Sequence, residues 1–185
     1  MVSLASLWLP ILVAAIGVFV ASSIIHMATP WHHGDFAALP DQARVMEALR
    51  SFNLRPGDYA LPRPASRQEM SSPEFTELAK RGPMVMMTVL PGNVVIAKNL
   101  VMWFAYCVVV ALCAAYVTGT ALPPGAAAKK VFQFAGATAF IGFALALWQQ
   151  TIWYNRSWVT TLKSNIDGLL YGLLTAGVFA WLWPR

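Results

Sequence analysis

The fold is decided by an uncharged apolar run near the start of the chain, LWLPILVAAIGVFVASSII at residues 7–25. As an α-helix this run would be about 28 Å long, close to the roughly 30 Å hydrocarbon core of a bilayer. Pro10 falls in its first turn, where the missing N–H costs little. The run therefore predicts a membrane-spanning helix.

Three further runs have the same character and lie at residues 100–120, 131–148 and 166–183. The turn sequence LPPG at 122–125 predicts that the second and third spans form an antiparallel hairpin. Only 11% of the 185 residues are charged, against about a quarter in a soluble domain. We expect an all-α membrane protein with four antiparallel transmembrane helices, the first within residues 1–27 and the other three within 93–185.

Aromatic residues form two groups that fit four spans. Interfacial anchoring places Trp and Tyr at both membrane surfaces. The four-span arrangement puts one group at the surface that holds both chain ends: Trp8, Tyr116, Trp181 and Trp183. It puts the other group at the opposite surface: Trp31, Trp103, Trp148, Trp153, Tyr154 and Trp158.

Residues 28–92 differ in composition and hold most of the charged residues, so we expect them to form a small α+β insert in water between the first two spans. LPDQARVMEALRSF (39–52) and SSPEFTELAKRG (71–82) predict two short helices, the second with Ser72 as its N-cap. GDYALP (57–62) and MVMMTVL (84–90) predict two short strands that pair with each other.

All three histidines lie in HMATPWHH at 26–33, where the first span ends. Imidazole suits zinc, copper, iron and nickel, and His26, His32 and His33 with Asp35 form a complete ligand set in chemical terms. Met84 and Met86 add thioethers, which favour Cu(I). A copper, zinc or haem site is one hypothesis. In the other, the histidines anchor the helix end and bond to water or carbonyls.

Asp167 is the one acidic residue within a predicted span, and an ionisable group there is a functional candidate. Lys163 lies four residues earlier on the same helical face and is predicted to pair with it. A larger polar cluster at this membrane mouth is the alternative, and its predicted members are Gln149, Gln150, Tyr154, Lys163 and Asp167, with His26 nearby.

Small residues recur at every fourth position of the last span: Gly168, Gly172, Ala176 and Ala180. Such a stripe lets helix backbones approach closely in lipid. It predicts packing within the chain's own bundle or, alternatively, self-association. Cys107 and Cys113 lie six apart in one helix and cannot bridge each other, so we expect them to be structural.

Motifs for enzymes and for nucleic-acid binding are absent from the sequence. It contains no glycine-rich phosphate loop, no Gly-x-Ser-x-Gly and no His-Glu-x-x-His, and its basic residues are scattered. Three functions remain as hypotheses. The first is an accessory protein that associates with itself or with other membrane chains. The second is a metal- or haem-binding protein, and the third an ion- or small-molecule-handling bundle centred on Asp167.

Several motifs together resemble a group of uncharacterised bacterial four-helix membrane proteins. They are HMATPW (26–31), LPDQARVMEALR (39–50), PGDYALP (56–62), RGPMVMMTVLPG (81–92) and IDGLLYGLLTAGVFAWLWP (166–184). The resemblance implies a bacterial inner-membrane protein with four spans and an insert after the first, and no activity. With four spans both termini lie on one side, and the excess of Lys and Arg at the opposite surface favours a cytoplasmic insert.

Overall fold

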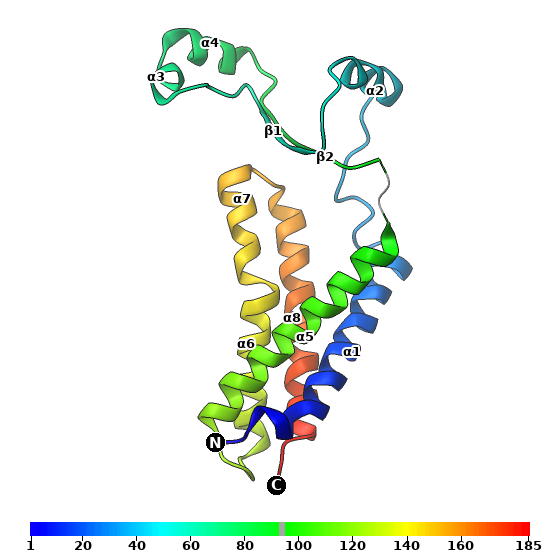
Figure 1. Cartoon of the computed structure of the whole chain (residues 1–185), viewed down its shortest axis with the longest axis vertical. Coiled ribbons are helices and arrows are strands. Elements are labelled where there is room, and N and C mark those ends of the chain that lie inside the picture. The colour runs from blue at the N-terminus through cyan, green and yellow to red at the C-terminus, as the bar shows by residue number, and fades with distance from the viewer. Residues whose placement is uncertain (93–94) are drawn as a thin grey trace. The chain divides into compact units, whose positions relative to one another are not determined.

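The computed structural model describes residues 1–92 and 95–185, which fold as two compact units (Figure 1). The first unit combines Met1–Ala37 with Ile96–Arg185, and the second is Ala38–Val95. The predicted start of the insert at residue 28 is therefore ten residues earlier than the start of the second unit. The predicted end at residue 92 adjoins residues 93 and 94, which lie outside the described residues.

The first unit is helical. It contains a 3-10 turn η1 (Leu4–Leu7), α1 (Trp8–Ser23), a π-helical turn η2 (Ile24–Ala28), α5 (Ile96–Ala121), α6 (Ala128–Phe143), a 3-10 turn η3 (Leu145–Leu147), α7 (Trp148–Tyr154) and α8 (Trp158–Trp181). Three stretches of the described chain are long and apolar enough to cross a membrane: Leu4–Ala28, Ile96–Ala121 and Ala128–Tyr154. The prediction of helices long and apolar enough to span a membrane is thus confirmed for these three, and α8 is not among them.

The third candidate span is interrupted, whereas the sequence predicted one continuous helix over residues 131–148. Its first part, α6, ends at Phe143, and Ala144 has φ −123° and ψ −48°, outside the helical region. The Tyr106 hydroxyl donates to the carbonyl oxygen of Gly142 at 2.6 Å, beside the interruption. A side chain that binds a backbone carbonyl in this way is a common companion of a helix break.

Close approach of α6 and α8 organises the first unit. A Cβ on Gly168 would lie 2.7 Å from the Cβ of Ala144, and one on Gly172 would lie 3.2 Å from the carbonyl oxygen of Gly136. Ala176 lies against Gly136 from the same face of α8. The stripe of small residues in α8 thus faces α6 within the chain, while its last member, Ala180, is partly exposed.

Both chain ends lie at the end of the first unit that holds the α5–α6 turn (Figure 1). The backbone N–H of Val2 donates to the carbonyl oxygen of Gly119 at 2.7 Å, and that of Gly125 donates to the carbonyl oxygen of Pro184 at 2.8 Å. The opposite end of the unit holds η2 and the first turns of α8, where the candidate site lies.

The second unit contains α2 (Gln42–Ser51), β1 (Gly57–Leu61), α3 (Arg67–Met70), α4 (Pro73–Arg81) and β2 (Val85–Val89). The strands pair antiparallel, with Gly57 opposite Val89 and Leu61 opposite Val85, so the predicted pairing is confirmed. Ser72 caps α4 by accepting from the Phe75 N–H at 3.1 Å. The prediction of two helices missed α3, a single turn whose N-cap is Ser66.

Candidate functional site

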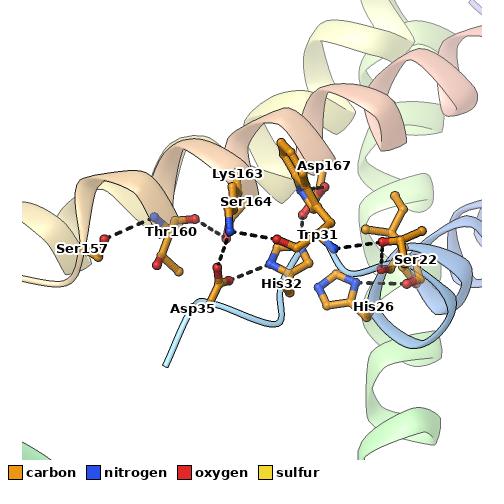
Figure 2. A network of polar contacts seen from close by, with 12 residues as sticks. Ser22, His26, Trp31, His32, Asp35, Ser157, Thr160, Lys163, Ser164 and Asp167 are labelled. Carbon is orange, nitrogen blue, oxygen red and sulfur yellow. Dashed lines mark hydrogen bonds and ion pairs between the residues drawn. The ribbon is translucent and has the colours of Figure 1, made fainter. Parts of the chain in front are cut away.

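A network of charged and aromatic side chains is centred on His32, in the loop that follows η2 (Figure 2). Its Nδ1 lies 2.7 Å from Asp35 Oδ2, and its Nε2 lies 2.7 Å from Asp167 Oδ2. An imidazole donates from both nitrogens only when it carries both protons. Both contacts are therefore hydrogen bonds from His32 only when the ring carries both protons, and with a neutral ring one carboxyl group must supply the proton of its own contact.

The chain between α1 and the network is shaped by its local sequence. The π-helical turn η2 carries His26, and the Thr29 hydroxyl donates to the carbonyl oxygen of Ile25. Thr29 itself is extended, with φ −113° and ψ 153°, as expected for a residue that precedes a proline. A turn then follows, in which the His33 N–H donates to the carbonyl oxygen of Pro30 at 3.1 Å. This turn brings Trp31 and His32 back towards α8.

Helix α8 contributes Lys163 and Asp167, which are four residues apart and share a face. The predicted Lys163–Asp167 pair is replaced by contacts across the bundle. Lys163 Nζ donates to Asp35 Oδ1 at 3.0 Å and to the carbonyl oxygen of Trp31 at 2.8 Å. Asp167 accepts instead from the indole N–H of Trp31 at 3.1 Å and bonds to His32. A helix dipole acts on charges within the first turn of the helix. Because α8 begins at Trp158, Asp167 lies well beyond that first turn.

Asp35 is a buried charge on a loop, since only 8% of its side chain is exposed. Burial by itself would raise the pKa of this carboxyl group, but hydrogen bonds from His32 and Lys163 and their nearby positive charge outweigh it and hold the pKa below its ordinary value. Asp35 therefore stays ionised at neutral pH.

His26 lies beside His32, with the two rings stacked at a centroid distance of 4.3 Å and an interplanar angle of 10°. Its Nδ1 lies 3.0 Å from the carbonyl oxygen of Ser22. A carbonyl oxygen only accepts, so this contact assigns a proton to Nδ1, and in the neutral ring Nε2 then holds the lone pair. Trp103 on α5 donates to the Ser22 hydroxyl at 2.8 Å, which connects the last turn of α1 to α5.

Three ligand groups converge from three segments of the chain. One nitrogen of His26, one nitrogen of His32 and one oxygen of Asp167 all lie within 4.8 Å of one another. Around a tetrahedral ion with bonds of about 2.0–2.1 Å, ligand atoms lie about 3.4 Å apart. To bind one such ion, the separations of up to 4.8 Å among the three ligand atoms would have to shorten by about 1.5 Å or less. The 2.7 Å contact between His32 and Asp167 would have to lengthen, also by less than about 1.5 Å.

The remaining predicted residues lie outside this group. His33 is exposed, and so are Gln149, Gln150 and Tyr154 on α7. Met84 and Met86 are exposed residues of the second unit. Asn165, which the sequence did not single out, is buried on α8 and accepts from the Trp148 indole at 2.9 Å.

Two further residues of the site, Trp31 and Ser22, are not marked by any pattern in the sequence. Trp31 was predicted only as a membrane-surface anchor, yet its indole N–H and its carbonyl oxygen both bond to α8. Ser22 was counted as one residue of an apolar run. No motif marks either residue, because the contacts depend on a partner far away in the sequence.

Comparison with known proteins adds no assignment: no family model, no curated protein and no solved structure matches the chain. The resemblance to bacterial four-helix membrane proteins therefore stays a prediction.

Proposed function

We propose that this protein is an integral membrane protein that binds a divalent transition-metal ion through His26, His32 and Asp167. One observation carries the proposal: the three ligand groups lie within 4.8 Å of one another, and Nδ1 of each histidine bonds to a protein oxygen, which leaves Nε2 as the nitrogen for a metal. Histidine ligands in metal sites nearly always donate their other ring N–H to a carbonyl or carboxylate in this way. Because the two rings are stacked nearly parallel, one of them would have to turn for both nitrogens to bind the same ion.

The donor set selects a class of metals. Two imidazole nitrogens and one carboxylate oxygen suit zinc, iron, cobalt, nickel and manganese, whereas Cu(I) favours sulfur. Asp35 and Asp167 carry two negative charges and Lys163 one positive charge, so with His32 neutral the network has one net negative charge, which a divalent cation complements. A copper site that includes Met84 and Met86, or a haem site, has less support, since these methionines lie in the second unit.

We also propose that α8 is a fourth span of a bacterial inner-membrane protein. Its 24 residues would extend about 36 Å, enough to cross. Its polar side chains lower its hydropathy, but Asn165 and Asp167 are buried and bonded inside the bundle. Polar residues of spanning helices normally face the interior in this way.

Four spans place both termini on one side of the membrane. Ser3→Cys and Arg185→Cys, each in a chain with Cys107 and Cys113 replaced by alanine, would show this by labelling with a membrane-impermeant maleimide. Both sites are expected to react from the same side. Labelling from opposite sides would leave three spans.

Titration of the detergent-purified, chelator-treated protein with Co²⁺ tests the metal proposal. Bound cobalt in a site with nitrogen and oxygen ligands produces visible absorption bands, and we expect one ion per chain, displaced by Zn²⁺. His32→Ala and His26→Ala should each weaken binding by more than the roughly 10–100-fold that follows loss of an outer-shell partner.

His33→Ala is the matched control, because His33 neighbours the site in sequence but is exposed and outside the group. This variant should bind cobalt like the parent. Binding that is equal in the parent, in His26→Ala and in His32→Ala would overturn the proposal, and so would the absence of stoichiometric binding. His26 is exposed and makes few contacts, so its variant tests the site even where His32→Ala does not fold.

Of the other two hypotheses, a bundle that handles ions through Asp167 has less support. Asp167 is only 4% exposed, whereas a carboxylate that lines a path for ions or small molecules must be open to water. An accessory or self-associating protein stays a prediction, and the exposed apolar side chains of the second unit are the surface that it would use.

A further inference from the structure

The Nδ1 atoms of the two histidines of the site bond to different kinds of oxygen. Behind His26 lies the neutral carbonyl oxygen of Ser22, at 3.0 Å from Nδ1. Behind His32 lies the carboxylate of Asp35, at 2.7 Å from Nδ1. A carboxylate behind an imidazole orients the ring and raises its basicity as a ligand. The pairing makes His32 the stronger of the two nitrogen ligands.

Lys163 binds the carboxylate oxygen of Asp35 that His32 does not contact. Lys163 Nζ lies 3.0 Å from Oδ1, while His32 occupies Oδ2, so both oxygens of the carboxylate are bonded. The same ammonium group donates to the carbonyl oxygen of Trp31, the residue before His32. It also lies 5.6 Å from the centre of the Trp31 ring, within the range of a cation–π contact. Lys163 thus fixes both the carboxylate and the backbone next to the ligand.

Burial makes this arrangement more than a surface ion pair. The side chains of His32, Asp35 and Lys163 are 13%, 8% and 21% exposed. A charge removed from water is costly unless it is paired and hydrogen-bonded, so the buried Asp35 has one low-energy position, between Lys163 and His32. Exposed pairs elsewhere in the chain, such as Arg50 with Glu47, carry no such constraint.

We infer that Asp35 and Lys163 are positioning residues of the metal site: Asp35 holds His32 with its Nε2 towards the ion, and Lys163 holds Asp35. This inference rests on the proposed metal-binding function and adds the residues that set the affinity. Neither residue is among the three ligand groups. Each acts through His32, whose ring orientation depends on the carboxylate behind it.

Cobalt titration of two variants tests the inference. Asp35→Asn keeps the shape of the side chain but removes its charge, and Lys163→Met keeps the aliphatic stem but removes the ammonium group. We expect Asp35→Asn to weaken Co²⁺ binding by about 10–100-fold and Lys163→Met to weaken it by less. The visible bands of bound cobalt should also shift in Asp35→Asn, because a less basic imidazole changes the ligand field.

Asp58→Asn is the matched control, since Asp58 also accepts a side-chain hydrogen bond, from Thr88 at 2.6 Å, but lies in the second unit. Its cobalt affinity and spectrum should equal those of the parent. The melting temperature of each metal-free variant separates positioning from folding, since a purely structural role would lower it without a shift in the cobalt bands.

The outcomes distinguish the two proposals. A parent protein that binds no cobalt removes the metal site and the positioning role with it. A parent that binds cobalt, with unchanged affinity and spectrum in both Asp35→Asn and Lys163→Met, leaves the metal site in place and overturns the positioning role alone. If Asp35→Asn does not fold, Lys163→Met still decides, and an unchanged affinity there overturns the inference.

Discussion

The two units of the molecule use apolar residues in opposite ways. In the first unit, alanines such as Ala14, Ala114 and Ala135 are fully buried beside some large side chains such as Phe179, while Trp8 and Trp181 face outward. In the second unit, no residue that the structure describes is buried, and Phe52 is 70% exposed. Helices in lipid gain stability by close packing of small residues, and a unit in water needs a buried apolar core. Apolar content alone therefore does not indicate where a core lies.

Amide hydrogen exchange in detergent should show the largest difference between the units. Amides in the central turns of α8 are expected to exchange at least ~100-fold more slowly than those of α2 and α4, because opening a packed helix costs far more than opening an exposed one. Mass spectrometry of peptic peptides measures this. Protection of the α2 amides equal to that of the α8 amides would contradict the difference between the units and would show that another surface covers the second unit.

A substitution in the contact between α6 and α8 should have the next largest effect. Gly168→Leu is expected to destabilise the protein by about 1–3 kcal/mol, because even a Cβ at this position would lie 2.7 Å from Ala144. Gly177→Leu on the same helix is the control, since a Cβ there has nothing within 4 Å. Thermal unfolding in detergent compares the two. Equal melting temperatures would contradict close packing as the source of stability.

Loss of a helix cap in the second unit should have the smallest effect. Ser72→Ala removes the acceptor for the Phe75 N–H and should destabilise α4 locally by about 1 kcal/mol. Faster exchange of the α4 amides, with the α8 amides unchanged, is the expected result. Faster exchange of the α8 amides as well would show that the two units unfold together.

The sequence pointed to residues of the candidate site as members of two groups. The histidine cluster and Asp35 were predicted as one possible metal site, and Lys163 and Asp167 as part of a polar cluster with His26 nearby. The structure joins members of the two sets, since His32 and Asp167 are in contact although 135 residues separate them. No periodicity or short motif reports a contact over such a distance, so the sequence could not choose between His32 and His33 as the member of the candidate site.

The sequence by itself determined the features that depend on neighbouring residues. These are the three candidate spans, the paired strands and the cap of α4, because helix length, strand alternation and capping are local. Tertiary structure alone decided which polar groups meet. A buried charge is stable only beside a partner, and whether Asp35 and Asp167 find His32 and Lys163 depends on how α8 packs against the chain that follows α1.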